Sequence, residues 1–188
     1  MSDPVSVMPK PFKGYVTVSM DDPIGMLALR GDLASKPFAT AVKKSVSIDL
    51  PAACQIVQAG QISVGWMSPD ELLIFAPCKE VPELEAGLKK ALEKKHFMLA
   101  DVSDARVSFT LSGPKVREVI AKLAPIDVAP GQFEPGTFRR TRFGQVSTAF
   151  WLVSDKEARV ICFRSVADFM FKQLSAAAQP GSEVGLWG

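Results

Sequence analysis

Hydrophobic and polar residues alternate along the chain with two periods, one typical of strands and one typical of helices. Residues 15–20 alternate with a period of two, which predicts a strand. Short apolar runs predict further strands at 26–30, 61–66, 72–76, 107–111, 145–153 and 159–164. Apolar residues at helical spacing predict helices over 33–44, 82–95 and 116–123, and a last helix from Ser165. Strands and helices mix along the chain, so the expected class is α+β.

The helix over residues 82–95 has the clearest sequence signature. Leu84, Leu88 and Leu92 fall on one face, and Pro82 suits the first helical turn, where its missing N–H is not needed. Lysines gather at the end of the segment, where they complement the helix dipole. This lysine run is interpreted as a solvated helix face, with a patch for a phosphate or an acidic partner as the alternative.

The two halves of the chain repeat one pattern. The matching triplets are Leu29-Arg30-Gly31 with Leu111-Ser112-Gly113, Ile48-Asp49-Leu50 with Ile126-Asp127-Val128, and Gly60-Gln61-Ile62 with Gly144-Gln145-Val146. Each half then runs through a turn that contains Asp70 or Asp155. This order predicts two pseudo-symmetric strand-helix-strand-strand-helix units, which pack together because neither can cover its own apolar face.

The domain organisation expected from this pattern is one domain over 14–178, with halves at about 14–100 and 101–178. A Pro-rich arm (1–13) precedes it and a flexible tail (179–188) follows. The chain is 47% hydrophobic and 22% charged over 188 residues, which is typical of a globular protein. No apolar run is long enough to span a membrane, and the first residues lack a secretory pattern. A cytoplasmic location is expected.

Composition also limits the chemistry expected of this chain. The three cysteines (Cys54, Cys78 and Cys162) are far apart, and His96 is the single histidine. The nucleotide-binding glycine motifs and the nucleophile elbow are missing from the sequence. The formal net charge of +2 is too small to argue for nucleic acid. No catalytic or metal-ligating residue is therefore expected in this chain.

The segment Phe138–Phe143 concentrates positive charge. In an extended strand Arg140 and Arg142 share a face with Phe138. Arginine gives bidentate hydrogen bonds to planar anions, so Arg139, Arg140 and Arg142 are candidates for contact with an anionic cofactor. A protein interface and a plain surface strand are the alternatives.

Two weaker features remain open. Asp101 and Asp104 are either an acid–base pair or, more simply, a polar turn before a strand. Trp66 lies before the turn at Pro69-Asp70 and is assigned either to packing or to a ligand or partner.

Several short motifs resemble the gamma subunit of heterotetrameric sarcosine oxidase. They are Asp101 to Arg106, Leu111 to Pro114, Arg117 to Ile120, Lys122, Pro125 to Asp127, Phe133 to Gly136, Gly65 to Leu72 and Arg164 to Phe169. Their order and spacing cover roughly residues 25–177.

The resemblance implies a fold like the folate-binding domain of aminomethyltransferases, built from tandem ferredoxin-like halves. It implies a non-catalytic subunit, packed on the alpha subunit of a complex with beta and delta subunits that oxidatively demethylates sarcosine to glycine and passes one carbon to tetrahydrofolate. FAD, FMN, NAD and tetrahydrofolate then belong to the partner subunits, and no cofactor belongs to this chain. No membrane or nucleic-acid partner is implied.

The interface anchors expected in this reading are Trp66, Trp151, Arg139 and Arg142, because buried Trp and Arg dominate interface energetics. The alternative function is a free-standing folate- or pterin-binding module of the same fold, with the arginine cluster meeting a polyglutamate tail. An autonomous methyl-group transferase is the third and weakest hypothesis.

Overall fold

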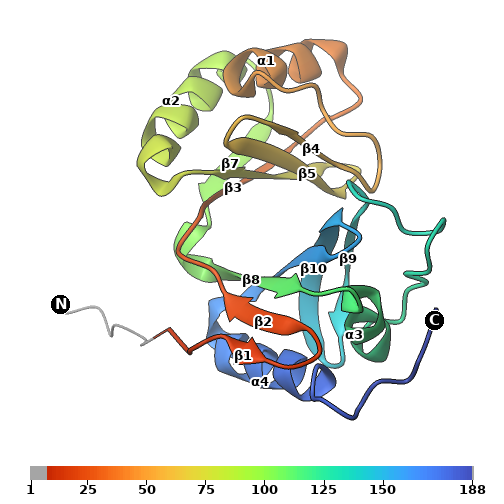
Figure 1. Cartoon of the computed structure of the whole chain (residues 1–188). Helices are drawn as coiled ribbons and strands as arrows, with labels where there is room; N and C mark the ends of the chain where they lie inside the picture. Colours follow the sequence, from red (N-terminus) through yellow and green to blue (C-terminus); the bar gives the residue numbers. More distant parts are fainter. Residues whose placement is uncertain (1–7, 188) are drawn as a thin grey trace.

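The computed structural model describes residues 8–187, which form two antiparallel sheets that face each other, each with two helices on its outer side (Figure 1). Residues 1–7 of the arm predicted at 1–13, and residue 188 of the predicted tail, lie outside the described part of the chain. The α+β class predicted from the hydrophobic pattern is confirmed.

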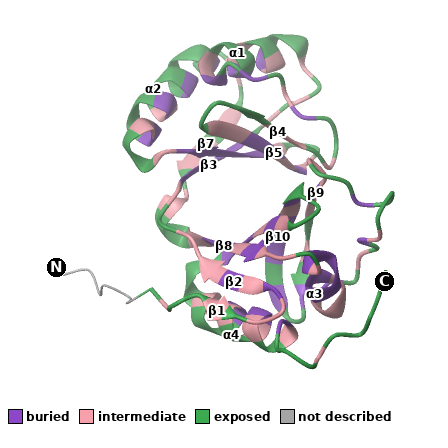
Figure 2. Cartoon of the chain, viewed as in Figure 1, coloured by how far each residue is buried: buried purple, intermediate pink, exposed green. Residues whose placement is uncertain are grey.

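The first sheet has the strand order β4-β5-β6-β3-β7. Its strands are β3 (Gly25–Gly31), β4 (Ile56–Ala59), β5 (Ile62–Ser68), β6 (Glu71–Ala76) and β7 (Phe97–Asp101). Helices α1 (Lys36–Val46) and α2 (Val81–Leu92) cover its outer face, each with one buried side and one exposed side (Figure 2). Leu29, Leu72 and Ile74 of the central strands are buried beneath them, so alternate strand residues supply this core.

The second sheet has the order β1-β2-β8-β11-β10-β9. Its strands are β1 (Phe12–Lys13), β2 (Thr17–Met20), β8 (Arg106–Ser112), β9 (Phe138–Phe143), β10 (Val146–Ser154) and β11 (Glu157–Phe163). Helices α3 (Val116–Leu123) and α4 (Ala167–Ala177) lie on its outer face. Phe109, Leu111, Phe150 and Val160 fill the core beneath them.

The N-terminal strand β2 belongs to the second sheet, although chain order assigned residues 14–24 to the first half. Val18 of β2 pairs antiparallel with Leu111 of β8, as Leu99 of β7 pairs with Leu29 of β3. The Tyr15 N–H also donates to the Ala178 carbonyl just after α4, at 3.1 Å. β2 thus takes the place in the second half that β7 takes in the first, because an unpaired edge of β8 would expose its backbone groups.

The internal repeat predicted from the triplets is visible in the backbone. Gly60 and Gly144 end β4 and β9 at matching turns, with φ of 59° and 57°. Asp70 and Asp155 lie in the matching turns of the β5–β6 and β10–β11 hairpins. Each sheet has more strands than the predicted strand-helix-strand-strand-helix order. β7 and β2 pair with β3 and β8, and β4 and β9 pair with β5 and β10 at the opposite edges. The edge strands β4 and β9 lack the apolar runs that predicted the others.

The two sheets meet through a small apolar joint. Phe138 of β9 and Trp151 of β10 face Phe75 of β6, with ring centroids 5.6 Å (Phe138–Trp151) and 5.2 Å (Phe75–Trp151) apart. A β-carbon on Gly65 of β5 would lie 3.0 Å from the Phe138 ring, so a larger residue here would require the ring to shift by a few tenths of an ångström. The Phe138 N–H also donates to the Cys54 carbonyl at 2.8 Å. The joint fixes the two halves against each other.

Two glycine substitutions test the assignment of Gly87 to helix α2 and of Gly60 to the turn after β4. α2 has Pro82 in its first turn and Lys89 and Lys90 in its last, as predicted. A β-carbon on Gly87 within it would meet no atom within 4 Å, so Gly87→Ala is expected to stabilise the protein by about 0.5–1 kcal/mol. Gly60→Ala places a side chain at positive φ and is expected to cost about 1 kcal/mol. Urea unfolding of both variants measures these changes in the free energy of unfolding. Changes of the same sign would contradict the helical position of Gly87 or the turn position of Gly60.

Candidate functional site

A groove of about 430 Å³ lies where one end of the second sheet approaches the β5–β6 hairpin of the first. Its polar wall contains Arg106 at the start of β8 and Arg140 and Arg142 on β9. Phe163, at the end of β11, is paired with Arg106 across the strands, and Glu71 of β6 lies on the other side. We call this the arginine groove.

The arginines of the groove are poorly neutralised by the chain itself. Arg140 lies 3.7 Å from the Glu71 carboxylate, a distance at the limit of an ion pair. The Arg106 guanidinium lies 5.2 Å from the centroid of the Phe163 ring, and its buried Nε has no hydrogen-bond partner. Arg142 is exposed and makes no hydrogen bond or ion pair with residues 8–187. One carboxylate therefore faces three cations.

Burial changes the pKa of Arg106. Loss of solvent lowers the pKa of the Arg106 guanidinium, and the neighbouring Arg140 lowers this pKa further, while the Glu71 carboxylate opposes the shift. Arginine nevertheless stays protonated in proteins. The groove thus presents a charged guanidinium that has lost part of its hydration, and an anion that enters it would compensate for that loss.

The other arginines of the described chain all have partners. Arg30, Arg117, Arg159 and Arg164 each lie within 4.0 Å of a carboxylate oxygen. Arg139 donates to the Cys54 and Phe138 carbonyls and lies 6.0 Å from the Phe133 ring centroid. Among the described residues, the arginine side chains with neither a hydrogen bond nor an ion pair are Arg106 and Arg142, and both line the arginine groove.

The structure separates the arginines that the sequence grouped together. Arg140 and Arg142 share the inner face of β9 with Phe138, as the period-two pattern predicts. Arg139 lies on the opposite face, so Arg139, Arg140 and Arg142 do not converge on one ligand. Arg106 takes the third position, which sequence reasoning missed because strand pairing, not sequence proximity, brings β8 to the groove.

The two tryptophans proposed as interface anchors lie in different layers. Trp151 is half-buried in the joint between the sheets. Trp66 is half-buried on β5, opposite Leu72, whose side chain is in the core beneath α1 and α2. Arg139 and Arg142 lie on β9 of the second sheet, and the role of these four residues as interface anchors stays a prediction.

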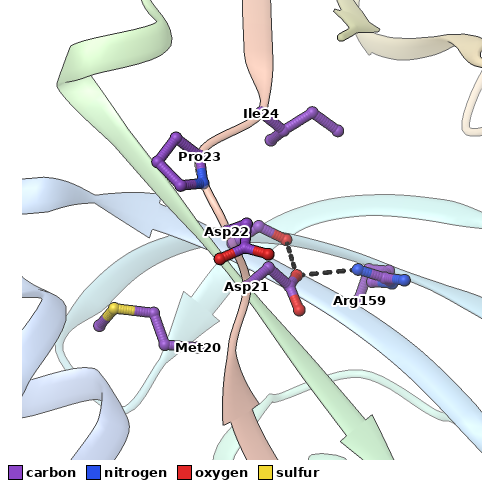
Figure 3. A pocket seen from close by; sticks show the side chains of 7 residues that line it. Met20, Asp21, Asp22, Pro23, Ile24 and Arg159 are labelled. Carbon is purple, nitrogen blue, oxygen red and sulfur yellow. Dashed lines mark hydrogen bonds and ion pairs between the residues drawn. The ribbon is translucent and has the colours of Figure 1, made fainter. Parts of the chain in front are cut away.

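A second depression, of about 500 Å³, lies beside the crossing from β2 to β3 (Figure 3). Its central carboxylate, Asp21, accepts hydrogen bonds from Ser108 (2.6 Å), Thr110 (2.5 Å) and Arg159 (2.9 Å). These three donors of the chain itself satisfy the Asp21 carboxylate, which therefore links the end of β2 to β8 and β11.

The remaining candidates have structural roles in the described chain. Asp101 accepts hydrogen bonds from the backbone N–H and the hydroxyl of Ser103, while Asp104 lies 3.7 Å from Arg164, so the two carboxylates do not pair. Burial raises the pKa of the Cys162 thiol to about 12. Among residues 8–187 no group of three or more His, Cys, Asp or Glu side chains is arranged to hold a metal ion.

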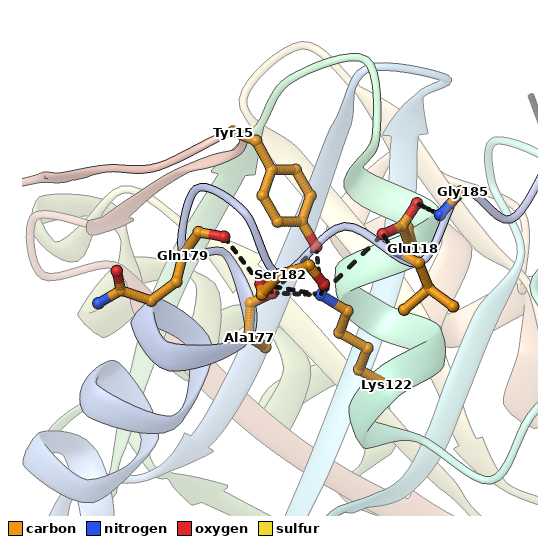
Figure 4. Close-up of polar contacts among 8 residues, drawn as sticks. Tyr15, Glu118, Lys122, Ala177, Gln179, Ser182 and Gly185 are labelled. Carbon is orange, nitrogen blue, oxygen red and sulfur yellow. Dashed lines mark hydrogen bonds and ion pairs between the residues drawn. The ribbon is translucent and has the colours of Figure 1, made fainter.

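A polar cluster on α3 ties both ends of the chain to the second half (Figure 4). Lys122 donates to the Tyr15 hydroxyl at 2.8 Å and to the Ala177 carbonyl at 3.0 Å, and it also reaches Ser182. The buried Glu118 carboxylate accepts the Val184 N–H at 2.6 Å. Residues 182–185 of the tail that the sequence predicts to be flexible therefore make specific contacts, which composition could not reveal.

Within residues 8–187, no helix combines the length and the apolar character that crossing a membrane requires.

The sequence and the structure match known proteins over most of their length. The SoxG family, described as sarcosine oxidase, gamma subunit family, matches residues 30–179. A sarcosine oxidase subunit gamma from Corynebacterium sp. (strain U-96) is 29% identical over 147 residues, which are 77% of this chain and 68% of that protein.

Solved structures agree with this match. A chain of the heterotetrameric sarcosine oxidase from Corynebacterium sp. U-96, in complex with pyrrole 2-carboxylate, superposes with a TM-score of 0.80 at 25% identity, covering 87% of this chain and 83% of that one. The glycine cleavage system aminomethyltransferase T from Bartonella henselae superposes with a TM-score of 0.66 at 11% identity, covering 90% of this chain and 48% of that one. The latter shows the fold alone and confirms the aminomethyltransferase-like fold with its tandem ferredoxin-like halves. From the family match over residues 30–179, which the structural likeness supports, we conclude that this chain belongs to the sarcosine oxidase gamma subunit family.

Proposed function

We propose that this chain is a non-catalytic subunit of a heterotetrameric complex that oxidatively demethylates sarcosine to glycine. In this proposal it packs on the alpha subunit, and the beta and delta subunits complete the assembly. The flavins, NAD and tetrahydrofolate are held by those partners, where they supply the redox and one-carbon chemistry. The observation that carries the proposal is the likeness, over 87% of the chain, to a subunit of a heterotetrameric sarcosine oxidase.

The distribution of polar groups supports a docking role. The charged side chains buried within the fold, such as Arg117 and Glu118, hold loops and the tail in place. The arginine groove instead leaves cations exposed at the surface. Uncompensated charge at a surface groove favours recognition of a partner because it steers association and sets register. A stable subunit contact also needs more than about 1,000 Å² of buried surface.

Co-purification tests this proposal directly. The affinity-tagged chain, expressed in its native host or together with the candidate alpha, beta and delta subunits from the same genome, is expected to elute with flavin absorbance and with sarcosine oxidation activity. Size-exclusion chromatography and mass spectrometry of the eluate identify the members of the complex. A chain that elutes alone while the other subunits assemble without it would contradict the proposal.

The arginine groove also favours a second candidate, a free-standing folate- or pterin-binding module, because guanidinium groups suit the carboxylates of a polyglutamate tail. Calorimetric titration of the isolated chain with tetrahydrofolate separates the two. Micromolar affinity that is lost in Arg140→Gln would support the module, and an absence of binding heat would support the subunit.

A further inference from the structure

We infer that the arginine groove receives a carboxylate-bearing segment, one or more Asp or Glu side chains, of a partner subunit. The inference rests on the proposed function and adds to it the chemistry of the contact. It assigns Arg106 and Arg142 as the main cations, with Arg140 shared between the partner and Glu71.

The charge balance of the groove carries the first step. Arg106, Arg140 and Arg142 face one carboxylate of this chain, Glu71, which leaves two positive charges uncompensated. Other arginines of the described chain, such as Arg117, have carboxylate or carbonyl partners of their own. A single arginine without a partner on an exposed surface is ordinary. Here Arg106 and Arg142, whose side chains make no hydrogen bond or ion pair among residues 8–187, line the same groove.

The second observation is the loss of solvent at Arg106. The Nε of Arg106 is buried and lacks a hydrogen-bond acceptor within the described structure. A buried donor without an acceptor is costly, and a carboxylate that enters the groove lined by this guanidinium would compensate for part of its lost hydration. Phe163 on the groove wall holds the Arg106 guanidinium by a cation–π contact and remains 48% exposed. A partner that covers Phe163 would remove water from the arginines and strengthen their hydrogen bonds to a carboxylate.

The occupant is a protein segment because the groove is open and formed by two layers. Its walls come from β5 and β6 of the first sheet and from four strands of the second. Guanidinium groups of Arg140 and Arg142, two residues apart on one strand face, suit carboxylates on an extended or helical segment. A free small anion in the same place is the competing outcome.

A competition experiment in the assembled complex tests the inference. Tagged variant and untagged wild-type chains are co-expressed in equal amounts with the partner subunits, and mass spectrometry gives their ratio in the purified complex. The double variant R106Q/R142Q is expected to be under-represented by about tenfold, and R142Q alone by about threefold. The matched control K89Q/K90Q, which removes two charges from the exposed face of α2, is expected to stay within about twofold of wild type.

A zero-length cross-link identifies the occupant. The Arg142→Lys variant carries an amine, which a water-soluble carbodiimide joins to a carboxylate in contact with it. In the intact complex, a cross-link from position 142 to an Asp or Glu of a partner subunit supports the inference. Equal incorporation of R106Q/R142Q and wild type, with cross-links absent, overturns it while leaving the subunit assignment intact. Binding of phosphate or citrate to the isolated chain, lost in R142Q and without effect on assembly, also overturns it. A wild-type chain that never enters the complex defeats the proposed function itself.

Discussion

Replacing Arg117 with Met is expected to lower the free energy of unfolding by about 3 kcal/mol, because it leaves the buried Val128 and Phe133 carbonyls without the donor that satisfies them. Arg117 is 6% exposed, and its guanidinium donates to the Val128 and Phe133 carbonyls and to Asp155 at 2.8 Å. The methionine fills the space but leaves these acceptors without their donor. Urea unfolding followed by circular dichroism measures the loss.

The internal repeat provides the matched control for this experiment. Arg30 contacts Asp70 at 2.7 Å, in the turn that corresponds to the turn of Asp155. This pair is about half exposed on both sides, so Arg30→Met is expected to cost less than about 1 kcal/mol. Similar losses in the two variants would contradict the view that burial, not pairing itself, makes Arg117 important.

Truncating Phe138 to Ala is expected to cost about 3–4 kcal/mol, since the ring is 1% exposed and fills the joint between the sheets. The variant also loses contacts with Trp151 and with the backbone at Gly65. Phe138 is one of seven buried residues in the apolar cluster between the sheets, so its loss is expected to weaken the coupling between the unfolding transitions of the two halves. Calorimetry then shows a broadened or double transition where the wild type shows a single one.

The control for this prediction is Phe169→Ala on α4, where the ring is 55% exposed. Its expected effect is below about 0.5 kcal/mol. A single sharp transition in Phe138→Ala, at the wild-type midpoint, would show that the joint does not hold the halves together.

The local pattern of hydrophobic and polar residues predicts most of the secondary structure. Residues 72–76 are apolar on both faces and form β6, which is central in the first sheet. The apolar face of α2 with Leu84, Leu88 and Leu92 is buried as predicted. These predictions succeed because side-chain periodicity depends on neighbours within one or two turns of the chain. The strands β1, β4, β7 and β9 are not among the strands that the hydrophobic pattern predicts.

The candidate site was predicted only in part. The strand period placed Arg140 and Arg142 on one face, and it also put Arg139 on the other, so a grip by all three arginines is geometrically excluded. Arg106 is 34 residues from Arg140 in sequence and reaches the groove through the pairing of β8 with β11 and of β11 with β10. The separation of two residues along the sequence does not show which strands will pair.

By itself, the sequence determined the α+β class, the repeated halves, the buried faces of the helices and, through its ordered motifs, the family. The tertiary structure alone decided that β2 completes the second sheet, that Lys122 and Glu118 hold the tail, and that Arg106 joins Arg140 and Arg142. The reason is physical. Periodicity is set by local backbone geometry, whereas the partners of a charge are set by which distant strands pair and by which groups lose water when the two sheets close.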